Sequence, residues 1–142
     1  MPHVKTQTFR DDIDIGRVVK EMVEEGDGLV GCVVAFLGAV RSIADDGAKV
    51  EKLSYEAEEK AVEEKMFRVC EEVASKYGVI GIRAYHKIGD AYAKRSTMCL
   101  FVSSKHKKEA FNALTELVDR MKYELPIQKK EYTDKGTRVI KG

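Results

Sequence analysis

The chain has 142 residues, 44% of them hydrophobic and 35% charged, which is typical of one folded domain spanning 1–142. Its formal net charge of +1 argues against a nucleic-acid partner, and no apolar run approaches the roughly 20 residues that cross a membrane. The first residues lack the apolar segment of a signal peptide, so we expect a cytoplasmic protein without a membrane partner.

The three cysteines, Cys32, Cys70 and Cys99, lie far apart in the sequence among apolar neighbours. This pattern favours reduced core residues, with a catalytic or sulfur-carrying cysteine as the alternative. No Cys/His spacing is typical of a metal site, so we expect no metal.

The first half of the chain mixes helical and extended patterns. Apolar residues at helical spacing predict a helix over 14–25, which Gly26 ends. The valine-rich run 29–37 is typical of a buried strand, and 49–56 predicts a second strand. A second helix, closed by Gly78, is indicated by apolar residues that recur on one face: Val62, Met66, Val69, Cys70, Val73 and Tyr77.

Two strands and a third helix follow. Residues 80–88 alternate between apolar and other residues and predict a strand with one buried face. On that face His86 is interpreted as a hydrogen-bonded structural histidine. Residues 98–102 predict another strand, after which Ser103 or Ser104 can cap a helix over about 105–123.

The chain closes with a pair of predicted strands. Pro126 cannot continue the third helix, and 127–133 and 137–141 read as strands on either side of a turn. The predicted order is α-β-β-α-β-β-α-β-β, without the regular alternation of a parallel sheet. We therefore predict an α+β fold with three helices and a mostly antiparallel sheet.

One lysine stands out on the third helix. Its predicted apolar face covers an arc of roughly 120°, and Lys122 lies just beyond the edge of this arc. The residues of this face, which we expect in the core, are Ala110, Phe111, Leu114, Leu117, Val118 and Met121. The lysine stem can therefore follow the core while its amine reaches a sheltered space suited to acid–base chemistry. The alternative is a lysine that extends into solvent near the negative end of the helix dipole.

The first turn of the same helix is basic. His106 and Lys107 lie where the helix dipole disfavours cations, and a bound anion such as phosphate would resolve this conflict. The alternative is a solvated basic turn. Lys107 and Lys122 are 15 residues apart, or about 22 Å along a helix, so one small substrate cannot touch both within one chain. We therefore predict a composite site at the interface of a homodimer.

The last strands add further charged candidates. In a strand, Lys129 and Glu131 share one face while Lys130 points to the other. The alternative is a charged surface strand with a weak ion pair. Arg41 follows a predicted strand and a glycine, and arginine in such a loop suits bidentate contact with phosphate.

Taken in order, these segments resemble the large, catalytic subunit of molybdopterin synthase over nearly the whole chain. The seven-residue step from Lys122 to Lys129 is notably similar. The other matching segments are 33–41 (VVAFLGAVR), 53–57 (LSYEA), 85–89 (YHKIG), 104–107 (SKHK), 110–111 (AF), Pro126 and 129–131 (KKE).

The resemblance implies an α/β hammerhead fold and a role in molybdenum cofactor biosynthesis. It implies sulfur transfer to cyclic pyranopterin monophosphate (precursor Z), which forms the dithiolene of molybdopterin. The implied sulfur donor is a ubiquitin-like small subunit with a thiocarboxylate on its C-terminal glycine. The implied assembly is a homodimer of large subunits with a small subunit at each end, a heterotetramer.

Site residues are implied at matching positions. Lys122 and Lys129 would be the two catalytic lysines, one to stabilise the oxyanion formed during acyl transfer and the other to move a proton. The steps need no cofactor and no metal. The residues implied to line the substrate and phosphate region are Arg41, His106, Lys107, Lys130 and Glu131.

Two other functions compete with this one. A non-catalytic module could bind a ubiquitin-like tail or an anionic ligand, but it would not need both Lys122 and Lys129. An RNA-binding domain could use the basic C-terminal strands. The near-neutral charge and the lack of an aromatic pair for base stacking argue against RNA.

Overall fold

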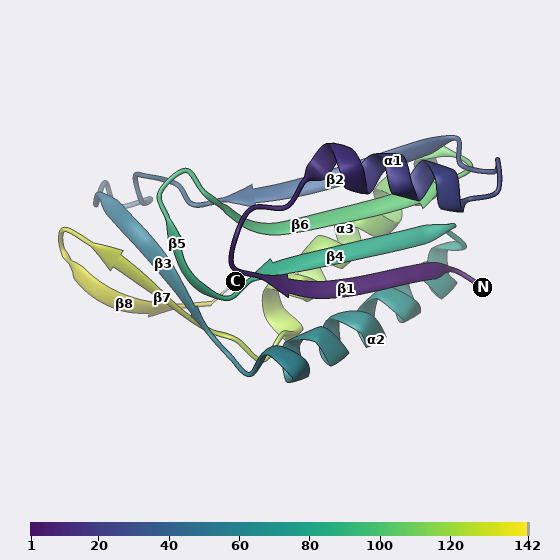
Figure 1. Ribbon diagram of the computed structural model, residues 1–142. Helices are drawn as coiled ribbons and strands as arrows, with labels where there is room; N and C mark the ends of the chain where they lie inside the picture. The colour runs from purple at the N-terminus through teal and green to yellow at the C-terminus, as the bar shows by residue number, and fades with distance from the viewer. Residues whose placement is uncertain (142) are drawn as a thin grey trace.

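The computed structural model describes residues 1–141, which form three helices and eight strands (Figure 1). The elements in chain order are β1 (His3–Phe9), α1 (Ile15–Glu25), β2 (Cys32–Ala39), β3 (Val50–Glu56), α2 (Glu59–Tyr77), β4 (Gly81–Lys87), β5 (Gly89–Tyr92), β6 (Ser96–Ser104), α3 (Lys107–Glu124), β7 (Gln128–Thr133) and β8 (Gly136–Ile140). The strands form two four-stranded sheets, with the orders β1-β4-β6-β2 and β5-β3-β7-β8. Only β1 and β4 pair in parallel among these strands. The predicted α+β class with mostly antiparallel pairing is confirmed, and the strands divide between two sheets.

The first sheet is covered on both faces (Figure 1). Helices α2 and α3 pack together against one face, where Ile82 and Ala84 of β4 join the main core. Helix α1 covers the other face, where Tyr85 of β4 packs in a separate cluster with Met22 and Phe101. Because side chains of a strand alternate between faces, β4 is buried on both.

The prediction of one buried face for 80–88 is therefore wrong. Arg83 is only 6% exposed, and its guanidinium pairs with Glu21 at 2.6 Å and Glu25 at 3.0 Å, both on α1. A buried charge needs such partners. Arg83 can therefore lie on the second buried face of this strand, because α1 supplies two carboxylates there.

Two strands escaped prediction, β1 and β5. Strand β1 lies at the edge of the first sheet and pairs in register with β4, for example Val4 with Ile82. Its inward side chains include threonines rather than large apolar residues, and Thr6 and Thr8 hydrogen bond to Glu63 of α2. This polar anchoring gives β1 no apolar signature.

The structure of the valine-rich run 29–37 also differs from its prediction, both in where the strand begins and in how far it is buried. Residues 29–37 were expected to be a buried strand, whereas β2 begins at Cys32 and forms the opposite edge of the first sheet. Leu37 is 52% exposed. Because β2 is an edge strand, it has a neighbouring strand on only one side. The described residues 1–141 therefore bury this apolar run only in part.

The helix boundaries agree with the sequence for α1 and α2. Asp14 caps α1 by accepting a hydrogen bond from the Arg17 backbone N–H at 3.2 Å. Gly78 ends α2 with a left-handed φ of 67°, and its N–H donates to the Ala74 carbonyl. None of the helices within residues 1–141 is long and apolar enough to cross a membrane.

Helix α3 departs from its prediction in two respects. Ser103 and Ser104 belong to β6 and do not cap the helix, which begins at Lys107 after His106 at the N-cap position. Phe111 was expected in the core but is 56% exposed, and Ala113 takes the buried position. The apolar face of α3 is thus rotated away from the Phe111 side.

Candidate functional site

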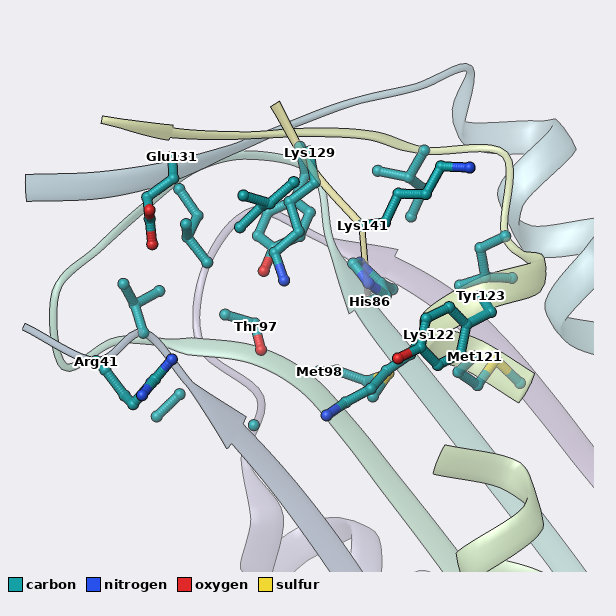
Figure 2. Close-up of a pocket in the computed structure, with 18 of the residues that line it drawn as sticks. Arg41, His86, Thr97, Met98, Met121, Lys122, Tyr123, Lys129, Glu131 and Lys141 are labelled. Carbon is teal, nitrogen blue, oxygen red and sulfur yellow. The ribbon is translucent and has the colours of Figure 1, made fainter. Parts of the chain in front are cut away.

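A cavity of about 760 Å³ lies between the two sheets, beside the C-terminal end of α3 (Figure 2). One side consists of the ends of β2, β4 and β6, and the other consists of β3, β7 and β8. Its volume falls within the range of small-molecule binding sites. Neither sheet forms this cavity alone.

Basic side chains from three segments project into this cavity (Figure 2). Arg41 comes from the loop after β2, Lys122 from the last turn of α3, and Lys129 from β7. Glu131 is the acidic residue that accompanies them in the lining. The cavity therefore concentrates positive charge although the whole chain is nearly neutral.

Lys129 has the more sheltered of the two amines. Its side chain is half-buried, and Nζ lies 5.9 Å from the centre of the Tyr55 ring. Burial lowers the pKa of Lys129, and the nearby charges of Lys122 and Arg41 lower it further, against an opposing effect of Glu131. Lys129 is thus the amine best suited to exchange a proton.

Lys122 occupies a more open position than the sequence suggested. The residue is exposed, and its Nζ lies 5.9 Å from the centre of the Phe36 ring. The sequence placed the sheltered amine here, whereas the structure places it at Lys129. Because both amines line one cavity, one anionic ligand can meet both of them.

The alternation predicted for β7 is visible in the structure. Lys129 and Glu131 both line the cavity, whereas Lys130 does not and lies 3.9 Å from Glu56 of β3. Glu131 is well sheltered, with 12% of its side chain exposed, and accepts a hydrogen bond from Arg138 of β8 at 2.6 Å. Arg41 pairs with Asp45 at 2.7 Å in an exposed position, so its guanidinium can exchange this partner for a ligand.

The structure does not bring His106 and Lys107 to this cavity. Both are exposed at the opposite end of α3 from Lys122. Within one chain, the predicted site residues therefore form two groups. Arg41, Lys122, Lys129 and Glu131 line the cavity, while His106, Lys107 and Lys130 lie outside its lining.

His86 lines the cavity although the sequence indicated only a structural role. The residue is 8% exposed, and its ring meets Tyr55 edge-on at 5.1 Å between ring centres. Nδ1 lies 2.8 Å from the Lys87 carbonyl, which can only accept, so Nδ1 carries the proton. The predicted hydrogen bond is confirmed.

Burial is also the main cause of the low pKa of His86, about 4, and the charge of Lys129 adds to it. The imidazole is therefore neutral near pH 7. Tyr55, beside it, has a pKa raised to about 12 by burial and remains a neutral phenol. Both residues were missed because their exposure to the cavity depends on where the second sheet lies.

The cysteines do not contribute to the cavity lining. Cys70 and Cys99 are buried, and burial raises the pKa of their thiols to about 12 and about 11. Thiols with such pKa values are poor nucleophiles at neutral pH. Within residues 1–141, no cluster of three or more metal-ligating side chains occurs.

The comparison with known proteins gives consistent results. A family model described as MoaE protein matches residues 8–124. A molybdopterin synthase catalytic subunit from Pyrococcus abyssi is 37% identical over 125 residues, which covers 84% of each chain. The crystal structure of molybdopterin synthase from Staphylococcus aureus has a TM-score of 0.85 at 29% identity and covers 96% of each chain.

A more distant neighbour is a complex of subunits 1 and 2 of molybdopterin-converting factor from Helicobacter pylori. Its TM-score is 0.72 at 20% identity, with 96% of this chain and 89% of that chain covered, so this likeness concerns the fold alone. The family match includes Arg41 and Lys122 but ends before β7. Lys129 and Glu131 lie in β7, beyond the family match, and it is the structure that places them in the cavity lining.

Proposed function

The chain belongs to the MoaE protein family, and from this membership we propose that it catalyses the sulfur-transfer step of molybdopterin synthesis. The substrate is cyclic pyranopterin monophosphate, and the product carries the dithiolene of molybdopterin. The observation that carries this proposal is the cavity in which Arg41, Lys122 and Lys129 converge. Two anionic reactants must meet, and local positive charge lowers the repulsion between them.

The two lysines suit different steps. The thiocarboxylate sulfur bonds to the substrate and gives a thioester between substrate and glycine. Water then adds to the glycine carbonyl carbon, so negative charge develops on the carbonyl oxygen before the C–S bond breaks, which leaves the sulfur on the substrate and a carboxylate on the glycine. The exposed amine of Lys122 is placed to stabilise that charge. Lys129 has a lowered pKa and is suited to accept or donate a proton as the pterin side chain rearranges.

The sulfur donor in this proposal is a ubiquitin-like small subunit with a C-terminal glycine thiocarboxylate. The Helicobacter pylori relative, which is a complex of two subunits, supports such a partner. An extended tail that ends in small residues can enter a cavity between two sheets. Its terminal charge would then lie among Arg41, Lys122 and Lys129.

His106 and Lys107 would join the site through a homodimer. They are exposed and lie at the opposite end of α3 from the cavity. A two-fold axis that sets two α3 helices antiparallel would bring these residues of one protomer toward Lys122 of the other. We propose that this pair binds the substrate phosphate there, and that Lys130 lies at the rim of the composite site. We also propose that residues 1–142 act as one cytoplasmic unit.

The test is reconstitution with a thiocarboxylated small subunit and precursor Z, followed by detection of dithiolene product. Lys122→Ala and Lys129→Ala should each lower the rate by about 100-fold or more. Lys76→Ala serves as the matched control, because Lys76 pairs with Glu116 on the surface outside the cavity. Near-normal rates in both cavity variants would contradict the proposal, and tail binding without any product would favour the non-catalytic binding module.

A further inference from the structure

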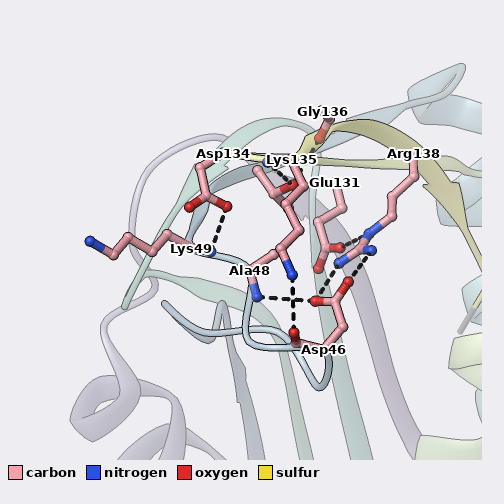
Figure 3. Close-up of polar contacts among 9 residues, drawn as sticks. Asp46, Ala48, Lys49, Glu131, Asp134, Lys135, Gly136 and Arg138 are labelled. Atoms are coloured by element: carbon pink, nitrogen blue, oxygen red, sulfur yellow. Dashed lines mark hydrogen bonds and ion pairs between the residues drawn. The ribbon is translucent and has the colours of Figure 1, made fainter.

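Arg138 of β8 joins the cavity wall to a loop. Its Nε donates to Glu131 at 2.6 Å, and its terminal nitrogens contact Asp46 at 2.8 and 3.3 Å (Figure 3). Asp46 lies in the loop 40–49 between β2 and β3. One guanidinium therefore connects strand β7, strand β8 and the loop that carries Arg41.

The loop side of this connection is itself held in place. The Asp46 carboxylate accepts the Ala48 backbone N–H at 3.0 Å, and its backbone carbonyl accepts a hydrogen bond from Lys135 at 3.2 Å. Lys49 and Asp134 exchange two further hydrogen bonds at 3.0 and 3.1 Å. Arg138 is thus anchored by residues that do not belong to the cavity lining.

Glu131 has a second potential partner. Lys129 lies two residues away on the same face of β7 and lines the same cavity. Side chains at this spacing are about 7 Å apart at their bases, which a lysine and a glutamate can span. Nevertheless, Lys129 forms no ion pair with any residue in the range 1–141.

From this geometry we propose that Arg138 is a positioning residue. It holds the Glu131 carboxylate against Asp46 and β8, and it thereby leaves the Lys129 amine unpaired for anionic reactants. The consequence for sulfur transfer rests on the function proposed above. The effect on Lys129 itself does not, because it concerns only groups within this chain.

The charges around Lys129 explain why the carboxylate must be held. Lys122 and Arg41 face the amine as cations, and Glu131 is the anion that opposes them. The cavity lining near these groups also includes Lys141 and the neutral rings of His86 and Tyr55. A released Glu131 carboxylate would move to the nearest free cation, and Lys129 is on the same strand face.

The experiment measures the pKa of Lys129 by NMR with labelled lysine in the free protein. Arg138→Met should raise this pKa by about 1, because an opposite charge that comes within 4–6 Å shifts a pKa by about that much or more. Loss of the Arg138 charge alone also raises the pKa, so the measurement is repeated in a Glu131→Gln background. There the rise should be much smaller, since no carboxylate is released.

Controls separate this effect from general damage. Arg120 of α3 bridges two carboxylates, Glu124 and Glu72, outside the cavity lining. Arg120→Met should therefore leave the pKa of Lys129 unchanged. Arg138→Lys retains a cation beside Glu131 and should keep the Lys129 pKa close to that of the parent protein. If Arg138→Met unfolds, Arg138→Gln, which also removes the charge, takes its place in both backgrounds with the same expected results.

The outcomes distinguish the two proposals. An equal rise in both backgrounds, or no rise, would overturn the positioning role even if the parent protein makes product. A larger rise in the protein that retains Glu131 than in the Glu131→Gln background establishes the role, whether or not any product forms. In an active enzyme, the limb of the pH–rate profile that reports Lys129 should move to higher pH by the same amount.

Discussion

At the scale of single residues, Lys122 and Lys129 share a cavity but not an environment. Lys129 is half-buried over Tyr55, with its pKa lowered mainly by burial. Lys122 is exposed near Phe36. A fixed positive charge can replace an amine that only stabilises an anion, but it cannot replace one that moves a proton.

This difference predicts different responses to arginine. Lys129→Arg should lose about 100-fold or more in product formation, because arginine keeps its charge but does not release its proton. Lys122→Arg should retain most activity, since the cation beside the developing oxyanion remains. Single-turnover rates with thiocarboxylated partner would measure both, and equal losses in the two variants would contradict the division of roles.

His86 should make stability depend on pH. Its pKa is about 4 in the folded protein compared with 6.5 for a free histidine, so the unfolded chain binds more protons between these values. The stabilisation is present above pH 6.5 and is lost as the pH falls toward 4. The expected contribution is about 3 kcal/mol, from roughly 1.4 kcal/mol for each pH unit between the two pKa values.

Urea unfolding of the parent protein and His86→Asn at pH 7 and pH 4.5 would measure this contribution. The asparagine keeps a donor near the position of Nδ1 but does not titrate. The parent protein should therefore lose more free energy of unfolding than the variant on acidification. Parallel losses in the two proteins would show that His86 is not the titrating group.

At the scale of helices and strands, the sequence predicted the elements whose signal is local. Helix α2 followed from its apolar spacing and from Gly78, which ends it in a left-handed conformation. Strand β1 could not be found in this way, because its pairing partner β4 is distant in the sequence. Two helices and two strands lie between β1 and β4 along the chain. Its inward threonines bond to Glu63 rather than forming an apolar face.

The same limit applied to the site. Alternation along β7 was enough to predict that Lys129 and Glu131 share a face opposite to Lys130. Which lysine is sheltered, and whether His86 faces a cavity, depend on how the second sheet lies over the first. No pattern within one segment carries that information.

Helix α1 provides an element-scale prediction. Arg83→Met removes the guanidinium that holds Glu21 and Glu25 against the sheet. We expect a loss of about 2 kcal/mol, less than for a fully buried ion pair because both glutamates are partly exposed. Hydrogen exchange of the α1 amides should accelerate more than that of the α2 amides.

Arg17→Met is the matched control for this variant. Arg17 pairs with Glu21 on the exposed side of α1 at 3.0 Å, and surface pairs contribute about 0.5 kcal/mol or less. Comparable losses in the two variants would mean that Arg83 does not anchor the helix. In that case the apolar contacts of Val18 and Met22 would account for its attachment.

At the scale of the whole molecule, the cavity depends on both sheets and, in the proposed homodimer, on two chains. A site made of Lys122 from one protomer and His106 with Lys107 from the other can be tested by mixing inactive variants. One variant carries Lys122→Ala, and the other carries His106→Ala with Lys107→Ala. Each alone should be nearly inactive.

After the two variants are unfolded together and refolded in equal amounts, half of the dimers should be mixed. Each mixed dimer contains one intact site and one doubly damaged site. About a quarter of the parental activity should therefore return, as two-fold symmetry requires. Activity that stays at the level of the separate variants would place His106 and Lys107 outside the site.

The hairpin β7–β8 carries Lys129, Glu131 and Arg138, and it follows all the other described elements in the chain. Protein synthesis proceeds from the N-terminus, so the first sheet and its three helices leave the ribosome before this hairpin does. The reactive amine of Lys129 is therefore added to the chain only after every element of that scaffold has been synthesised. We expect prematurely terminated chains that lack the hairpin to form no product.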